Sequence, residues 1–207
     1  MLEFIISKIG ILLFAVATAS VLIFFSLGMK DIFVGEQGRE IATSIIKQAK
    51  GLSETDALCT SLRMQLPRYI DIYGSTETFS LSAITYVFKV SSVDLGNNKT
   101  SVVFSMYKKS GNKIKDIFAV DSFNTNSQVI FKDNSFQNDA DNFLYWDPTS
   151  PTENVIYIVK NMSLGQEKIY FVKCGYDTKN ANHYESCYLL LKELKENEGV
   201  YCVPTEQ

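Results

Sequence analysis

The chain begins with a long apolar run that ends at charged residues. About 21 positions from Ile9 to Met29 carry no charged side chain, and Lys30 and Asp31 follow directly. At about 1.5 Å per residue, a helix of this length covers the ~30 Å hydrocarbon core of a bilayer, where it satisfies its own backbone hydrogen bonds. The pattern therefore predicts a membrane-spanning helix over about residues 9–29.

Two other interpretations of this run fit less well. A secretory signal would be cut after the small residues Ala17-Thr18-Ala19, but the run continues to Phe25, so the new chain end would lie deep in hydrocarbon. A buried helix of a soluble core is seldom free of charge over so many positions. We therefore expect the helix to be retained as an anchor.

A second helical pattern continues from the first without a break. Apolar or small residues recur at spacings of three, four and seven: Val34, Gly38, Ile41, Ile45, Ala49 and Leu52. Gly51 is a stop signal near the end of this stripe. The sequence therefore predicts one helix over residues 1–52, membrane-spanning in its first half and amphipathic over residues 31–52.

Beyond residue 53 the period changes to that of a strand. Ile84, Tyr86, Phe88 and Val90 alternate with mostly polar neighbours, as in a half-buried strand. Turn residues at 95–98 lead into a strand-like run at 101–107, and turn residues at 110–112 lead into one at 114–120. Further strand-like runs follow at 128–132, 155–160 and 168–174. The fold class is therefore α+β, a long N-terminal helix followed by a mostly antiparallel β-sheet head over residues 53–207.

Two segments interrupt the strand pattern. Residues 133–152 are rich in Asn and Asp, and we expect a surface excursion for which Trp146 is a packing anchor. Four oxygen-bearing side chains there suit calcium, but their spacing matches no EF-hand loop, so a solvated loop is preferred; they are Asp139, Asp141, Asn142 and Asp147. In the tail, residues 188–196 predict a short helix or a strand followed by a helical turn, and residues 201–203 predict a last strand.

The cysteines indicate the compartment of the head. All four follow the long helix, and they are Cys59, Cys174, Cys187 and Cys202. An even count suits disulfides in an oxidising environment, and the spacing matches no zinc site. Three pairings are open. We prefer a local Cys174–Cys187 bridge, which closes a loop of about 14 residues and stabilises by roughly 3 kcal/mol; this leaves Cys59 with Cys202.

Two glycosylation sequons agree with an oxidising location. Asn98-Lys99-Thr100 and Asn161-Met162-Ser163 both lie in polar, turn-like sequence, so Asn98 and Asn161 are predicted glycosylation sites. Together with the cysteines, they favour an extracytoplasmic head on the cell membrane or the cell surface.

Charge and motif content narrow the function classes. A formal net charge of −3 and a pI near 5.3 provide no basic field for a phosphate backbone, so we expect no nucleic-acid partner. The chain has no nucleophile elbow and no glycine-rich phosphate loop, and the single histidine, His183, lies in a polar stretch typical of a solvated loop. We therefore expect no enzymatic activity, no cofactor and no bound metal.

The arrangement of the chain resembles type IV pilin-like proteins, especially archaeal pilins and archaellins. An apolar helix runs directly into an amphipathic one, and Leu66-Pro67-Arg68-Tyr69-Ile70 then leads into a β domain. In that family the apolar helix is held in the membrane before assembly and forms the central bundle of a filament afterwards, while the head faces solvent. The resemblance implies a structural subunit or minor component of a pilus-like surface filament, a homo-oligomer assembled through its first helix.

The start of the chain departs from the family pattern. Pilin precursors carry a basic leader and a glutamate at the fifth mature position, whereas we expect no leader here, Glu3 lies only near that position, and Lys8 lies inside the expected bundle. The alternative is a single-pass membrane-anchored surface protein whose β domain binds an extracellular or envelope partner. Small residues in the span permit close helix packing, although ordinary lipid-facing composition also explains them. The expected assembly residues are Gly10, Ala15, Ala17, Ala19 and Ile23.

Overall fold

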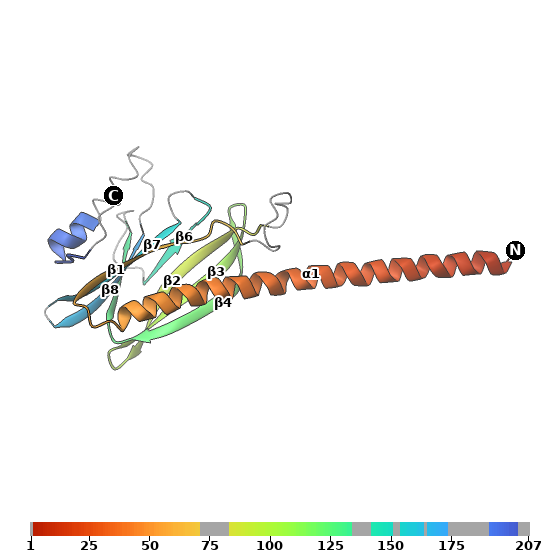
Figure 1. Ribbon diagram of the computed structural model, residues 1–207. Coiled ribbons are helices and arrows are strands. Elements are labelled where there is room, and N and C mark those ends of the chain that lie inside the picture. Colours follow the sequence, from red (N-terminus) through yellow and green to blue (C-terminus); the bar gives the residue numbers. More distant parts are fainter. Residues whose placement is uncertain are drawn as a thin grey trace.

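The computed structural model describes residues 2–70, 83–133, 142–150, 154–163, 165–173 and 191–202, and their side chains except those of 2–7, 26–27, 30–31 and 163. Helix α1 runs without interruption over Leu2–Ser53. Its N-terminal half extends away from a β-rich head, and its C-terminal half lies along that head (Figure 1). The predicted continuity of the two helical segments is confirmed.

The described part of the head contains two four-stranded sheets, in the orders β1-β7-β8-β5 and β4-β3-β2-β6. The first sheet consists of β1 (Cys59–Gln65), β5 (Gln128–Asp133), β7 (Val155–Ser163) and β8 (Gln166–Lys173). The second consists of β2 (Tyr86–Gly96), β3 (Lys99–Ser110), β4 (Lys113–Thr125) and β6 (Phe143–Trp146). The paired strands are antiparallel except β5 and β8, which run parallel. The predicted α+β layout with a mostly antiparallel head is therefore confirmed.

A two-residue turn sets the register of the second sheet. Asn97 and Asn98 join β2 to β3 with φ angles of 53° and 57°, the left-handed conformation that a tight hairpin requires and that asparagine tolerates. In this register Phe88 lies opposite Met106, and both side chains face the core. The predicted hairpin is confirmed.

The C-terminal half of α1 is part of the core of the head. The predicted stripe is buried except for Ile41, which is half-buried, and the buried positions are Val34, Gly38, Ala42, Ile45, Ile46, Ala49 and Leu52. From Ala42 onward they pack with apolar residues of both sheets, including Phe104, whose ring lies 5.7 Å from that of Phe88 and 5.9 Å from that of Phe171. Because each buried side chain contributes about 1.5–3 kcal/mol, this half of the helix stabilises the head directly.

A short helix over residues 191–197 covers the outer face of the first sheet. Its Leu191 and Leu194 pack, together with Val200, on alternate side chains of β7 and β8, namely Tyr157, Val159, Tyr170 and Val172. The intervening side chains of the same strands face the main core. Burial on both faces explains why these two strands are almost continuously apolar in sequence.

One strand was not predicted, and two local predictions are wrong. Residues 59–65 form the edge strand β1, whose mixed polar sequence gives no clear alternation. Strand β6 lies inside the segment expected to be a surface excursion, although its Trp146 is fully buried and is the packing anchor that was expected. Tyr201 and Cys202 lie in a turn rather than a strand.

Candidate functional site

The part of α1 that lies outside the head presents an exposed apolar surface. No side chain from Lys8 to Phe25 is buried, and the stretch is long and apolar enough to cross a membrane. Phe14 and Phe24, for example, are 74% and 77% exposed. A contiguous apolar surface of this kind marks a contact with lipid or with another protein.

The expected assembly residues all lie on this exposed stretch; they are Gly10, Ala15, Ala17, Ala19 and Ile23. A β-carbon at Gly10 would meet nothing within 4 Å, so the helix surface is open there. The hydroxyl groups of Thr18 and Ser20 donate to the carbonyl oxygens of Phe14 and Val16 at 2.5 and 2.8 Å. These two polar groups are therefore satisfied within the helix, as apolar surroundings require. Assembly through these residues stays a prediction.

Strand β4 holds α1 to the head. A β-carbon at Gly38 would overlap the ring of Phe118, so only glycine permits this approach of helix and strand. At Gly35 a β-carbon would lie 3.8 Å from the carbonyl oxygen of Phe118. Further along, the Thr43 hydroxyl donates to Oδ2 of Asp121 at 3.1 Å. These contacts show that β4 runs broadly in the same direction as α1.

A buried lysine ties the end of α1 to the first sheet. Lys160 on β7 is 4% exposed, and its Nζ donates to the carbonyl oxygens of Ser53 and Thr55 at 2.8 and 2.6 Å. The same Nζ lies 3.3 Å from Oε2 of Glu167 on β8. A positive charge that binds carbonyls at the C-terminal end of a helix also complements the helix dipole.

The hydrogen-bond network of Lys160 continues to the end of the second sheet. The Ser127 hydroxyl donates to Oε1 of Glu167, and the Thr125 hydroxyl donates to Oγ of Ser127 at 2.9 Å. This network was not predicted from the sequence. One signal for the burial of Lys160 was available: Lys160 lies two residues after Ile158 on the same strand, so both side chains are on the side that faces the core.

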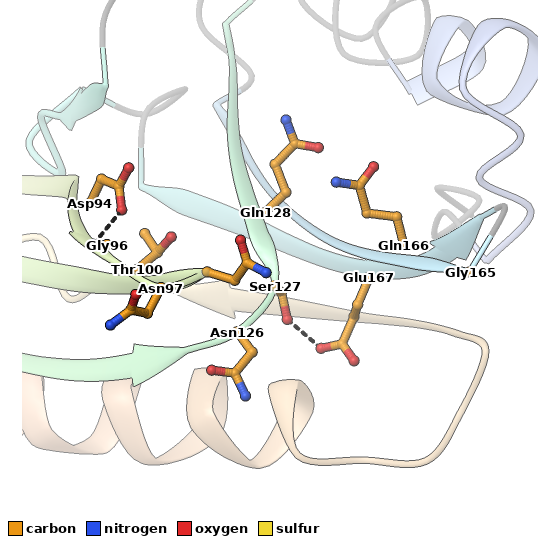
Figure 2. A pocket seen from close by; sticks show the side chains of 11 residues that line it. Asp94, Gly96, Asn97, Thr100, Asn126, Ser127, Gln128, Gly165, Gln166 and Glu167 are labelled. Atoms are coloured by element: carbon orange, nitrogen blue, oxygen red, sulfur yellow. Dashed lines mark hydrogen bonds between the residues drawn. The ribbon is translucent and has the colours of Figure 1, made fainter.

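A polar cleft of about 620 Å³ lies beside this network, where three turns meet (Figure 2). The turns join β2 to β3, β4 to β5 and β7 to β8, and the lining includes Asp94, Asn97, Asn98, Gln128, Gln166 and Glu167. Figure 2 shows the amide groups of Gln128 and Gln166 on the same side of neighbouring strands. Because β2 and β4 meet the cleft at their ends remote from the exposed helix, we call it the distal cleft. Its amide, hydroxyl and carboxylate groups suit hydrogen bonding to a polar partner.

The structure contains the disulfide Cys59–Cys202, with a Cα–Cα distance of 5.5 Å. This part of the preferred pairing is confirmed. Cys174 and Cys187 lie outside the described residues. The bridge joins the first residue of β1 to the turn that follows the short C-terminal helix.

The two sequons lie in different surroundings. Asn98 is exposed in the β2–β3 turn, and glycosylation there stays a prediction. Asn161 lies within β7, is 4% exposed, and its Nδ2 is buried without a hydrogen-bond partner. The expectation of a surface turn is therefore wrong for Asn161, and the folded head leaves no room for a glycan on its amide nitrogen.

The side chains weighed as metal or catalytic groups do not form a common site in the described part of the chain. Asp147 pairs with Lys109 and accepts hydrogen bonds from Thr149. Burial raises the pKa of Asp147, but the hydrogen bonds from Lys109 and Thr149 and the charge of Lys109 outweigh it and lower the pKa overall. No group of three His, Cys, Asp or Glu side chains among the described residues is placed to hold a metal ion. Outside these residues lie Asp139, Asp141 and His183.

Comparison of the chain with protein-family models, with curated proteins and with solved structures finds no match. Its function is therefore inferred from the exposed apolar helix, the distal cleft and the contacts that join them.

Proposed function

We propose that the protein is a structural subunit or minor component of a pilus-like surface filament, held in the membrane before assembly and packed through α1 afterwards. The observation that carries this proposal is the wholly unburied stretch Lys8–Phe25. Each large apolar side chain gains about 1.5–3 kcal/mol when it leaves water, so covering the stretch gains on the order of 20 kcal/mol. Lipid and a bundle of identical helices both provide such a cover.

Two further features support assembly with the head outside. The single continuous α1 fixes the apolar stretch to the head through the contacts of Gly38, Thr43 and the Lys160 network, so packing of the helices also positions the heads. The disulfide Cys59–Cys202 is typical of proteins in an oxidising compartment. The head therefore faces the cell exterior in this proposal.

A charge placed in the exposed helix tests the proposal. Ala17→Asp or Ile23→Asp is expected to abolish filaments in electron micrographs, because a carboxylate in the dry bundle costs several kcal/mol. The head of each variant should keep the fluorescence of its buried Trp146. Leu95→Asp is the matched control, since Leu95 is 53% exposed on the head and its change should leave filaments intact. Normal filaments formed by Ile23→Asp would reject the proposal.

The distal cleft favours a second candidate function, a single-pass surface protein whose head binds an extracellular or envelope partner. The cleft lies at the end of the head that would be farthest from the membrane. In this case micrographs of the purified chain show no filaments, and Gln128→Ala with Gln166→Ala weakens attachment to the native partner surface without affecting membrane retention.

A further inference from the structure

The apolar surface of α1 continues onto the base of the head. Ile32 and Phe33 on α1 are 68% and 43% exposed, and Ile114 and Ile117 on β4 are 53% and 52% exposed. We call these four residues the collar. Val34 between the helix and the head is fully buried, so the collar begins where α1 enters the core.

The helix places its part of the collar close to the expected membrane surface. A span that ends near Met29 puts Phe33 about 6 Å further along the axis, at 1.5 Å per residue. The headgroup region adds about 5–8 Å on each side of the ~30 Å hydrocarbon core. Ile32 and Phe33 therefore lie within the headgroup layer when the helix stands upright.

Strand β4 brings Ile117 to the same region. Gly35 lies against the backbone of Phe118, which directly follows Ile117. Because Asp121 contacts Thr43 further along the helix, Ile117 lies at the end of this contact that is nearest to the exposed half of α1, and Ile114 lies three residues earlier on the same strand. Figure 1 shows α1 leaving the head at the end opposite the arrowhead of β4.

Two lysines of β4 suit an anionic lipid surface, and the acidic Asp116 lies between them and Ile117. Lys113 and Lys115 are both exposed and lie on either side of Ile114. Such a Lys-Ile-Lys run lets isoleucine enter the boundary between headgroups and acyl chains while the ammonium groups reach lipid phosphates. A symmetric contact between two copies would instead bring these lysines toward their own counterparts.

We propose that the collar rests on the bilayer surface, with its four apolar side chains in the headgroup layer and Lys113 and Lys115 against anionic headgroups. This inference rests on the proposed membrane insertion of α1. It adds a second lipid contact that fixes the orientation of the head relative to the membrane before assembly.

Quenching of tryptophan emission by brominated lipid tests the collar in the full chain. Ile117→Trp and Ile114→Trp report on the collar and Phe14→Trp on the span, while Leu95→Trp is the control, because Leu95 is as exposed as Ile114 but lies at the distal end of the same sheet. Native Trp146 is fully buried and supplies a constant background. Single copies are placed in nanodiscs of phosphatidylcholine and phosphatidylglycerol, with and without bromine near the headgroup end of the acyl chains.

The collar predicts that bromine quenches the added emission of Ile117→Trp and Ile114→Trp and leaves Leu95→Trp at the level of the parent. Quenching of Phe14→Trp alone would overturn the collar and leave the span intact, whereas no quenching in any variant would overturn membrane insertion itself. Emission of Ile117→Trp that shifts to the blue only in discs with two copies, without quenching, would identify a contact between chains and overturn the inference.

The contribution of the two lysines to lipid binding is measured separately. Lys113→Glu with Lys115→Glu in the Ile117→Trp variant is expected to reduce quenching in discs that contain phosphatidylglycerol and to change it less in pure phosphatidylcholine. Equal quenching before and after the two changes would overturn the contact with anionic headgroups.

Discussion

Alanine substitutions at two glycines of α1 are expected to have opposite effects on the stability of the head. Both Gly35 and Gly38 lie inside the helix, where alanine is favoured over glycine by about 1 kcal/mol. At Gly35 a β-carbon would meet only the carbonyl oxygen of Phe118 at 3.8 Å, an ordinary contact. Gly35→Ala should therefore raise the free energy of unfolding by up to about 1 kcal/mol.

At Gly38 the same methyl group meets a packed surface. It would overlap the ring of Phe118 and lie 3.3 Å from Cβ of Ala119, so the half-buried ring or the strand must move. Overpacking of this kind costs about 1–3 kcal/mol, which exceeds the gain in helix propensity. Gly38→Ala should therefore lower the free energy of unfolding by about 1 kcal/mol.

Urea unfolding in detergent, followed by the fluorescence of Trp146, measures both effects. Trp146 is fully buried in the core and reports on the head rather than on the exposed part of α1. In a double-mutant cycle, Phe118→Ala removes the ring, so adding Gly38→Ala to it should no longer destabilise the head. If Gly38→Ala stabilised the head as much as Gly35→Ala, the close approach of α1 and β4 would be refuted.

Three further predictions concern the head. Lys160→Met should lower the free energy of unfolding by about 3 kcal/mol, because it removes the donor to two partly buried carbonyl groups and leaves Glu167 without its cation. Lys50→Met, at an exposed i,i+4 pair, should change the free energy of unfolding by under about 0.5 kcal/mol in the same urea titration. Reduction of Cys59–Cys202, which are 143 residues apart, should cost up to about 5 kcal/mol by chain entropy, and equal urea midpoints with and without reductant would contradict this. The pKa of Asp147 is lowered in the folded head, so its ionised form stabilises the head fully at pH values above 3.8, the ordinary pKa of aspartate. This stabilisation is lost as the pH falls through the lower pKa of the folded state. Asp147→Asn should therefore flatten the loss of stability below about pH 4.

The sequence predicted the elements that local pattern determines. The uncharged run and the stripe from Val34 to Leu52 are enough to define α1, because the period of a helix is visible in one segment. The alternation around Phe88 and the Asn97-Asn98 turn define the first hairpin for the same reason. The pairing of Cys59 with Cys202 was only a preference, since spacing does not select among pairings.

Features that depend on distant contacts could not be predicted. Among the described strands β1 lies at the edge of its sheet, next to β7, and its sequence is mixed in polarity, so it shows no clear alternation. The burial of Lys160 depends on a carbonyl group 107 residues earlier in the chain, and nothing in its neighbours indicates that partner. The distal cleft is built from three separate turns, which only the pairing of the sheets brings together. The burial of Asn161 could not be predicted either, because its polar sequence segment lies within a buried strand.

The Cys59–Cys202 bridge also determines how the head responds to proteolysis. It closes the intervening chain into a covalent ring, so a single nick anywhere between these two residues leaves both fragments attached to α1. Shedding by one cleavage therefore requires a cut before Cys59. Residues 54–58 form a short link there, after the end of the helix; all of them except the half-buried Thr55 are exposed, and Leu58 is 69% exposed. A protease that released the head would act at this link, and the released fragment would lack the helical part of its own core.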